Sequence, residues 1–181
     1  MQVDLPAAAQ LRQQNLYAYL ASFRQKPGLL LVGEAPGWRG CRFSGIPFTS
    51  EAQLCSQELP FNGVRTSKRD LPYSEATATV FWKFMVPYQQ RFIVWNCIPY
   101  HPHRAGLSLT NRCPTRAEIR DHAGLLAGLV ERLEPRQVIA IGKSAQWALL
   151  QLGLKPRLVR HPAHGGAKEF ERNIQSILLD N

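Results

Sequence analysis

The chain has 181 residues, of which 45% are hydrophobic and 19% charged. These values are ordinary for a folded protein and exclude wholesale disorder and collagen-like repetition. Lys and Arg number 22 against 13 Asp and Glu, a net charge of +9 that favours polyanionic partners such as nucleic acid, although a merely basic soluble protein would share it.

The length and the apolar runs bound the type of protein. The longest purely apolar runs, such as residues 29–32 and 138–141, are far shorter than the ~20 residues that span a bilayer. Residues 1–10 lack the basic and apolar regions of a secretory signal. We therefore expect a single domain over residues 1–181 that is monomeric, cytoplasmic and not bound to membranes.

The first half of the chain predicts a helix, a strand, a loop and a second helix. A helical stripe covers about residues 7–23, and the apolar run at 29–32 is typical of a strand buried on both faces. Residues 33–73 are rich in Gly, Pro, Ser, Thr and Arg without periodicity, which predicts a long functional loop. Ser74 then begins a helix whose first turn is acidic at Glu75.

The second half continues the alternation of strands and helices. Thr115 and Glu118 form a capping box at the start of a long helix that ends before Pro135. The other expected elements are strands at 91–95, 138–142 and 157–160 and helices at 144–152 and 167–179. Alternation of this kind predicts an α/β fold with three layers, in which helices cover both faces of a central four-stranded parallel sheet.

Three strand ends carry polar clusters: Gly33-Glu34, Asn96 and His161. In parallel sheets, ligands bind at the carboxyl ends of the strands, so we expect these clusters to share a site. The alternative for Glu34 is a solvated loop acid. The segment that begins at Gly33 is not the dinucleotide fingerprint, because Pro36 breaks the G-x-G-x-x-G pattern.

Four segments in order resemble the uracil-DNA glycosylase superfamily over about residues 29–173. Gly33-Glu34-Ala35-Pro36-Gly37 looks like the first catalytic motif of the family 4 enzymes. Gly45-Ile46-Pro47-Phe48 looks like their next segment, which brings a stacking phenylalanine. Val94-Trp95-Asn96-Cys97-Ile98-Pro99 is similar to the strand end that carries a base-reading asparagine, and His161-Pro162-Ala163 resembles the second catalytic motif, usually His-Pro-Ser.

The resemblance implies a monofunctional DNA glycosylase that hydrolyses the N-glycosidic bond of uracil and leaves an abasic site for base excision repair. Breaking this bond builds positive charge on the sugar and negative charge on the base, so Glu34 and His161 suit the catalytic roles of anion and donor. Glu34 could also orient or deprotonate the attacking water. The alternatives are a glycosylase for hypoxanthine or xanthine and a damaged-DNA binding module with little turnover. A third alternative is a nucleotide-binding domain, but the sequence lacks a phosphate-loop motif, which argues against it.

The predicted substrate-binding residues are Gly33, Ala35, Phe48 and Asn96. Phe48 would stack on an extruded base, and the amide of Asn96 would match the adjacent carbonyl and N–H of uracil. The alternatives are a core aromatic for Phe48, an Asx turn for Asn96, and a capping or phosphate-contacting histidine for His161.

We expect DNA contacts from the basic and glycine-rich segments near these motifs. The DNA-binding candidates are Arg39, Arg42, Arg104, His164, Gly165, Gly166 and Lys168, with Arg116 as a further one. Four of these candidates lie at the start of the final helix: His164, Gly165, Gly166 and Lys168. The backbone N–H groups at a helix start favour phosphate binding.

No metal or cofactor is expected. Family 4 enzymes generally hold a four-iron cluster with an early C-x-x-C pair, whereas the first cysteine here is Cys41. The four cysteines, which we expect to be reduced thiols, are Cys41, Cys55, Cys97 and Cys113. The alternative is a metal site formed by His101, His103, Cys97 and Cys113, but the spacings between these residues are not those of zinc ligands.

Overall fold

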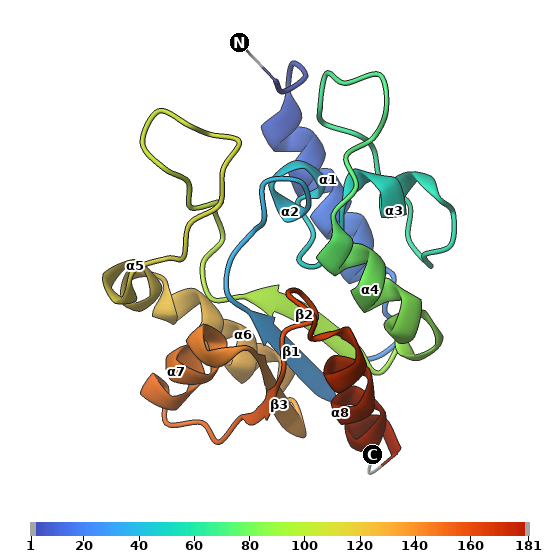
Figure 1. The fold of residues 1–181 in the computed structure, drawn as a ribbon. Helices are drawn as coiled ribbons and strands as arrows, with labels where there is room; N and C mark the ends of the chain where they lie inside the picture. Colours follow the sequence, from blue (N-terminus) through green and yellow to red (C-terminus); the bar gives the residue numbers. More distant parts are fainter. Residues whose placement is uncertain (1–2, 180–181) are drawn as a thin grey trace.

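The computed structural model describes residues 3–179, and its centre is a parallel sheet of four strands (Figure 1). The strands are β1 (Leu29–Gly33), β2 (Phe92–Asn96), β3 (Gln137–Ile141) and β4 (Arg157–Val159). Their order is β2-β1-β3-β4, and every neighbouring pair is parallel. The predicted α/β fold is thereby confirmed. The predicted domain span of 1–181 includes four residues outside the described range and stays a prediction.

The helices gather in two groups on either side of the sheet (Figure 1). In one group, α4 and α8 meet through Phe81 and Phe170, whose ring centroids are 5.9 Å apart. In the other, α5, α6 and α7 lie side by side around a small apolar hollow. The helices are α1 (Ala8–Ala21), α2 (Cys41–Ser44), α3 (Glu51–Cys55), α4 (Ala76–Met85), the 3-10 helix η1 (Val86–Tyr88), α5 (Arg116–Asp121), α6 (Ala123–Leu133), α7 (Lys143–Gln151) and α8 (Ala167–Leu179).

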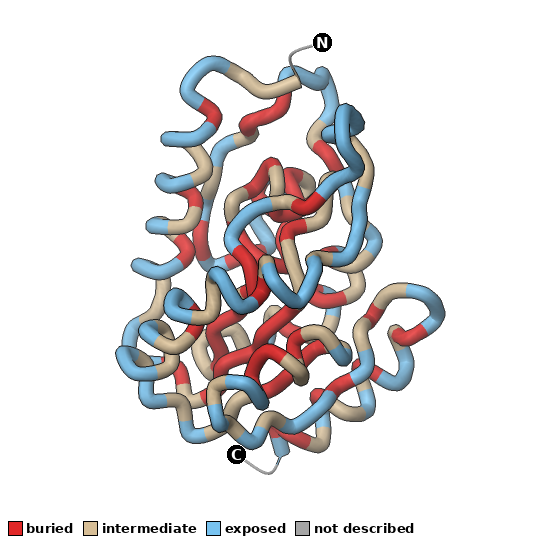
Figure 2. The backbone as a smooth tube through the Cα atoms, turned by 90° about the vertical axis from the view of Figure 1, so that its left-hand side faces the viewer, coloured by how far each residue is buried: buried red, intermediate tan, exposed pale blue. Residues whose placement is uncertain are grey.

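The central strand sets the register of the sheet edge. All five residues of β1 are buried, as expected of a strand covered on both faces. Figure 2 shows the buried stretches running through the middle of the molecule. The pairing of β1 with β2 puts Gly33 opposite Asn96. The first residue of the first motif therefore lies beside the asparagine of the third motif. Within residues 3–179, no helix has the length and apolar character needed to cross a membrane.

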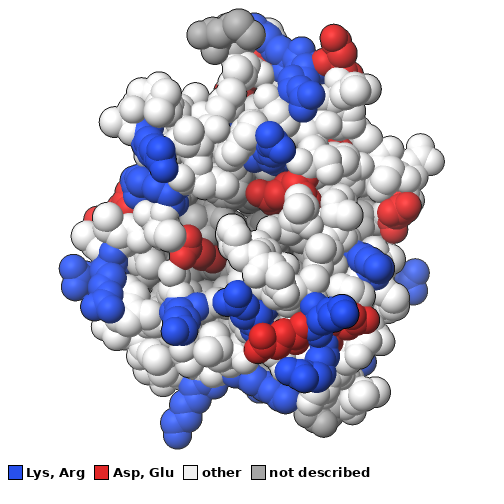
Figure 3. All heavy atoms as spheres, viewed as in Figure 1, with Lys and Arg blue, Asp and Glu red and all other residues white. Residues whose placement is uncertain are grey.

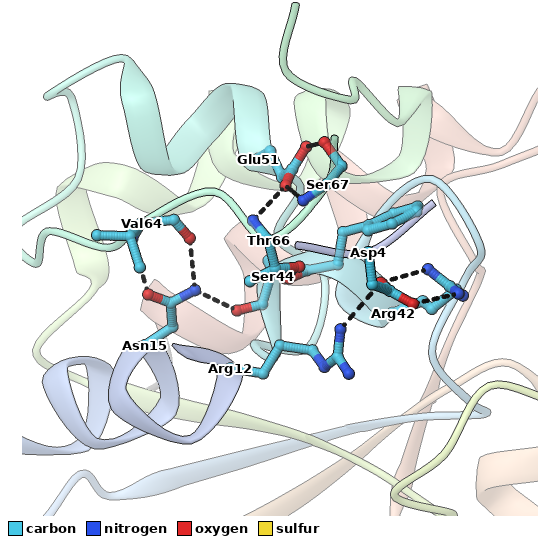
Figure 4. A network of polar contacts seen from close by, with 10 residues as sticks. Asp4, Arg12, Asn15, Arg42, Ser44, Glu51, Val64, Thr66 and Ser67 are labelled. Atoms are coloured by element: carbon cyan, nitrogen blue, oxygen red, sulfur yellow. Dashed lines mark hydrogen bonds and ion pairs between the residues drawn. The ribbon is translucent and has the colours of Figure 1, made fainter. Parts of the chain in front are cut away.

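The segment predicted as a loop, residues 33–73, contains the two short helices α2 and α3 and is tied down by buried polar groups (Figure 4). The amide of Asn15 on α1 donates to the carbonyl oxygens of Ser44 (2.8 Å) and Val64 (2.9 Å) and accepts from the N–H of Val64 (2.8 Å). These bonds satisfy the buried side-chain amide of Asn15. They also fix the backbone at Ser44 and Val64, which lies outside the β-sheet. Composition predicted the irregular path but not the helical turns.

A second difference concerns the helix predicted from Thr115 to about residue 133. The capping box of Thr115 and Glu118 is confirmed. The helix is broken at His122, however, into α5 and α6. The ring nitrogen Nδ1 of His122 lies 2.9 Å from the carbonyl oxygen of Glu118, the acceptor that a continuous helix would offer to the His122 backbone N–H.

Glu51 is the acidic centre of the irregular segment (Figure 4). Its carboxylate is fully buried and accepts hydrogen bonds from the backbone N–H groups of Thr66 (2.7 Å), Ser67 (2.8 Å) and Tyr73 (3.1 Å) and from the Ser67 hydroxyl (2.6 Å). Burial alone would raise the pKa of Glu51, but the Ser67 hydroxyl and the three N–H groups together hold it below the ordinary value.

We predict that Glu51→Ala lowers the free energy of unfolding by about 3 kcal/mol or more, because buried donors lose their acceptor. The folded pKa is lowered, so the stability that Glu51 contributes is present above its ordinary pKa of 4.5 and is lost as the pH falls through the lower folded value. Urea unfolding at several pH values measures both effects. Glu58→Ala on the exposed surface is the matched control, and equal stability of the two variants would contradict the prediction.

Candidate active site

A cavity of about 340 Å³ opens at the carboxyl edge of the sheet. The predicted residues that line it are Glu34, Ala35, Phe48, Asn96, His161 and His164. Its other lining residues are Pro36, Gly37, Cys41, Glu75, Thr77, Pro102, Asn111, Arg112, Cys113 and Ala163. Segments far apart in the sequence therefore converge on one pocket, and its size lies near the lower end of ligand sites, about 300–1,000 Å³.

The floor of the cavity is built on the last residue of β1. A Cβ atom at Gly33 would lie 2.7 Å from Phe48 Cζ and 2.8 Å from Asn96 Oδ1, so only glycine lets the ring and the amide approach. Phe48 has a φ of 52°, a left-handed conformation that is uncommon for a bulky residue. Its ring also packs on Phe81, at 4.9 Å between centroids, and faces His161, at 5.9 Å. Phe48 thus belongs to the core and to the cavity at once.

The amide of Asn96 is buried but weakly bonded. Its Nδ2 lies 3.9 Å from Cys41 Sγ, a poor acceptor, and the described residues 3–179 hold no backbone hydrogen bond to this side chain, as an Asx turn would require. Buried amides normally find strong partners. The donor and the acceptor of Asn96 are therefore open to a ligand in the cavity.

Glu34 follows β1 and is held in place by two neighbours. Its Oε2 accepts a hydrogen bond from the hydroxyl of Ser144, in the first turn of α7. The Cys113 thiol lies close enough that the Glu34 carboxylate, together with partial burial, raises the pKa of that thiol. Ser144 follows β3, so this strand end also reaches the site. The sequence offered that signal, because Gly142 ends the third predicted strand as Gly33 ends the first.

His161, after β4, is held as a neutral ring. The backbone N–H of Ala163 donates to its Nδ1 (3.1 Å), so the remaining proton of a neutral imidazole resides on Nε2. Burial, with the positive charges of His164 and Arg160, lowers the pKa of His161 to about 4. At neutral pH the ring is thus an uncharged N–H donor at the wall of the cavity.

Glu75 is a carboxylic acid that lines the cavity and that sequence reasoning did not place in the site. We predicted an acidic first helical turn, but Glu75 is the extended N-cap residue of α4, and its side chain makes no capping bond. The carboxyl group instead lies over Gly37 and Gly40, where a Cβ atom would come within 3.1 Å and 2.7 Å of Glu75 Cδ. Burial raises the pKa of Glu75 to about 7. The paired glycines were the only sequence signal of this approach.

The predicted DNA-binding residues separate into two groups. The exposed ones are Arg39, Arg104, Arg116, His164, Gly165 and Lys168. Arg42 differs, because its guanidinium forms an ion pair with Asp4 (3.1 Å) and lies over the Phe43 ring. Gly166 is buried against the carbonyl oxygen of His161, which makes it a backbone position of the turn. Figure 3 shows Lys and Arg side chains distributed around the hollowed face, with acidic side chains at the hollow.

The cysteines do not gather as metal ligands. Cys41 and Cys97 are buried, whereas Cys55 and Cys113 are exposed, and all four are free thiols. Over residues 3–179, no group of three or more His, Cys, Asp or Glu side chains is arranged to hold a metal ion. The residues present therefore do not fit the four-cysteine cluster of family 4 enzymes.

Comparison with protein families matches residues 21–178 to the Uracil DNA glycosylase superfamily. Comparison with curated proteins finds no match. The family match includes all four strands and every residue that lines the cavity. The chain therefore belongs to the uracil-DNA glycosylase superfamily, whose members are DNA glycosylases, hydrolases that cleave N-glycosidic bonds in DNA.

Proposed function

We propose that this DNA glycosylase removes uracil and leaves an abasic site. The observation that supports uracil is the Asn96 amide, which is buried at the cavity beside the Phe48 ring and lacks a strong partner among the described residues. One planar amide offers an adjacent donor and acceptor, which match the carbonyl and N–H of uracil and mismatch the reversed pattern of cytosine. Phe48 supplies a face for stacking.

The mechanism divides the developing charge between two residues. Glu34, oriented by Ser144, places a carboxylate where the sugar becomes positive and where an attacking water must be oriented. His161 donates through Nε2–H to the oxygen of the departing base, which becomes negative. A neutral imidazole donates without carrying charge into the ground state, so the bond strengthens as the base leaves.

We predict that Glu34→Gln and His161→Ala each slow the chemical step by about 10²–10³, the usual worth of a preorganised electrostatic group. DNA affinity should change little, because it depends on phosphate contacts by basic residues. Single-turnover cleavage and salt-matched binding measure the two quantities, and circular dichroism confirms folding. The substrates are single- and double-stranded oligonucleotides that carry uracil, hypoxanthine or xanthine.

Three outcomes of this experiment would contradict the proposal in whole or in part. Wild-type cleavage rates in both variants would remove Glu34 and His161 from the chemistry. Tight DNA binding by the wild-type protein without release of any base would instead identify a damaged-DNA binding module. Release of hypoxanthine or xanthine but not uracil would keep the glycosylase and change its substrate.

The pocket itself gives a separate prediction. Asn96→Asp replaces a donor by an acceptor and should cost about 2 kcal/mol or more of transition-state stabilisation on uracil. Phe48→Ala should cost roughly 1–3 kcal/mol through lost stacking. Single-turnover rates on uracil-containing DNA measure both losses, with Lys168→Ala as a control that should weaken binding rather than chemistry. Unchanged rates in both pocket variants would remove these residues from the site.

The protonation state of His161 can be tested without substrate. We predict that the ring stays neutral, with its proton on Nε2, until the pH falls to about 4. Because the folded pKa is depressed, the stability linked to His161 is present above its ordinary pKa of 6.5 and is lost as the pH falls through about 4. Imidazole ¹⁵N chemical shifts across a pH series report both tautomer and pKa. A protonated ring at pH 6 would contradict the assignment.

A further inference from the structure

Glu75 is the second carboxyl group at the cavity, and its placement has no structural explanation as a helix cap. It precedes α4 in an extended conformation, and its side chain makes no capping hydrogen bond. The carboxyl group fills the space over Gly37, the last residue of the first catalytic motif, and over Gly40 in the loop that follows. Side chains at those two positions would displace the carboxyl group.

The carboxyl group also lacks a partner. Among residues 3–179 we find neither a hydrogen bond nor an ion pair to its oxygens, in contrast to the four bonds that hold Glu51. The titratable or charged side chains that share the cavity wall with Glu75 are Glu34, Cys41, Arg112, Cys113, His161 and His164. Arg112 is engaged by Glu118 through two bonds of 2.6 and 2.8 Å. Burial is accordingly the one cause that raises the pKa of Glu75 to about 7.

Glu75 and the Asn96 amide line the same cavity, and the chain around Cys41 links them. The Asn96 Nδ2 atom points to Cys41 Sγ at 3.9 Å. The Glu75 carboxyl group lies over Gly40, the residue that precedes Cys41 in the chain. Glu75, Cys41 and Asn96 all line the cavity. The pKa of the buried Cys41 thiol is raised first by desolvation and then by the charge of Glu75.

On the basis of the proposed function, we infer that Glu75 is a specificity-determining residue: as the neutral acid, it donates a hydrogen bond to the carbonyl group that deamination has introduced into the base. Uracil, hypoxanthine and xanthine all carry such a carbonyl where the parent base has an amino group. The O–H of Glu75 supplements the Nδ2–H donor of Asn96, which lines the same cavity. The ionised form, which only accepts, would repel the carbonyl oxygen and would suit the amino group of the parent base.

The pH dependence follows from this role. Glu75 is protonated below about pH 7 and ionised above it. If the neutral form binds the base, excision is supported at low pH and lost as the pH rises through 7. His161 remains neutral over this range, since its pKa is about 4. This pH dependence is opposite in direction to that of an enzyme with a carboxylate as general base, whose activity rises as the carboxyl group loses its proton.

The test compares wild type, Glu75→Gln, Glu75→Ala and the exposed control Glu131→Gln in single-turnover excision between about pH 5.5 and pH 8.5. The substrates are matched oligonucleotides with uracil, hypoxanthine or cytosine. Glutamine keeps a neutral donor at every pH. Wild type and Glu131→Gln should lose about tenfold in rate per pH unit above 7, whereas Glu75→Gln should stay within about threefold. Glu75→Ala should be slow on both deaminated bases at every pH.

Each other outcome overturns the inference. A Glu75→Gln profile that follows wild type would show that another group titrates, and a folded but inactive Glu75→Gln would show that the acid is needed for more than donation. A Glu75→Ala variant as fast as wild type would remove the residue from base recognition. If the wild-type protein releases no base at any pH, the proposed glycosylase function fails and this role fails with it, an outcome distinct from active enzyme with an unchanged pH profile.

Discussion

The missing side chain of Gly33 is the constraint on which the cavity depends. Gly33 ends the central strand, and the space that its Cβ would fill is taken by the Phe48 ring and by Asn96 Oδ1. Because β1 and β2 are parallel and in register at this pair, Asn96 reaches the same point without any loop to place it. Phe48 reaches it only with a left-handed backbone, a strain that the surrounding core packing must offset. A pocket floor is thus obtained from sheet geometry rather than from flexible segments.

Three glutamates near the first motif show how surroundings assign different roles to one side chain. Glu51 has three backbone N–H groups and a hydroxyl around it and acts as an anionic anchor for the irregular segment. Glu34 accepts a hydrogen bond from the hydroxyl of Ser144, and its side chain lines the cavity. The Glu75 carboxyl group is largely buried and has no hydrogen-bond partner within residues 3–179, and this burial favours its protonated form.

Much of the architecture could be predicted from the sequence, because strand and helix periods alternate and each motif follows a strand. The register that joins Gly33 to Asn96 is a consequence of that alternation. What the sequence did not reveal depends on tertiary contacts. The helix breaks at His122, whose side chain contacts the Glu118 carbonyl oxygen that a continuous helix would bond. Arg42 pairs with Asp4, which lies 38 residues earlier in the chain. Glu75 looked like an ordinary acidic helix start, since nothing local distinguishes an acid that turns away from its helix.

The seat formed by Gly37 and Gly40 links positions that are distant in the sequence. Either glycine could accept a side chain only if the carboxyl group at residue 75 were withdrawn or shortened. Across related proteins, residues 37, 40 and 75 should therefore vary together: two glycines with a long acid, or a larger residue at the loop with a small one at the helix start. Such covariation would change the shape and polarity of one cavity wall without altering the strand ends, and so offers a route by which this sheet edge could acquire different base preferences.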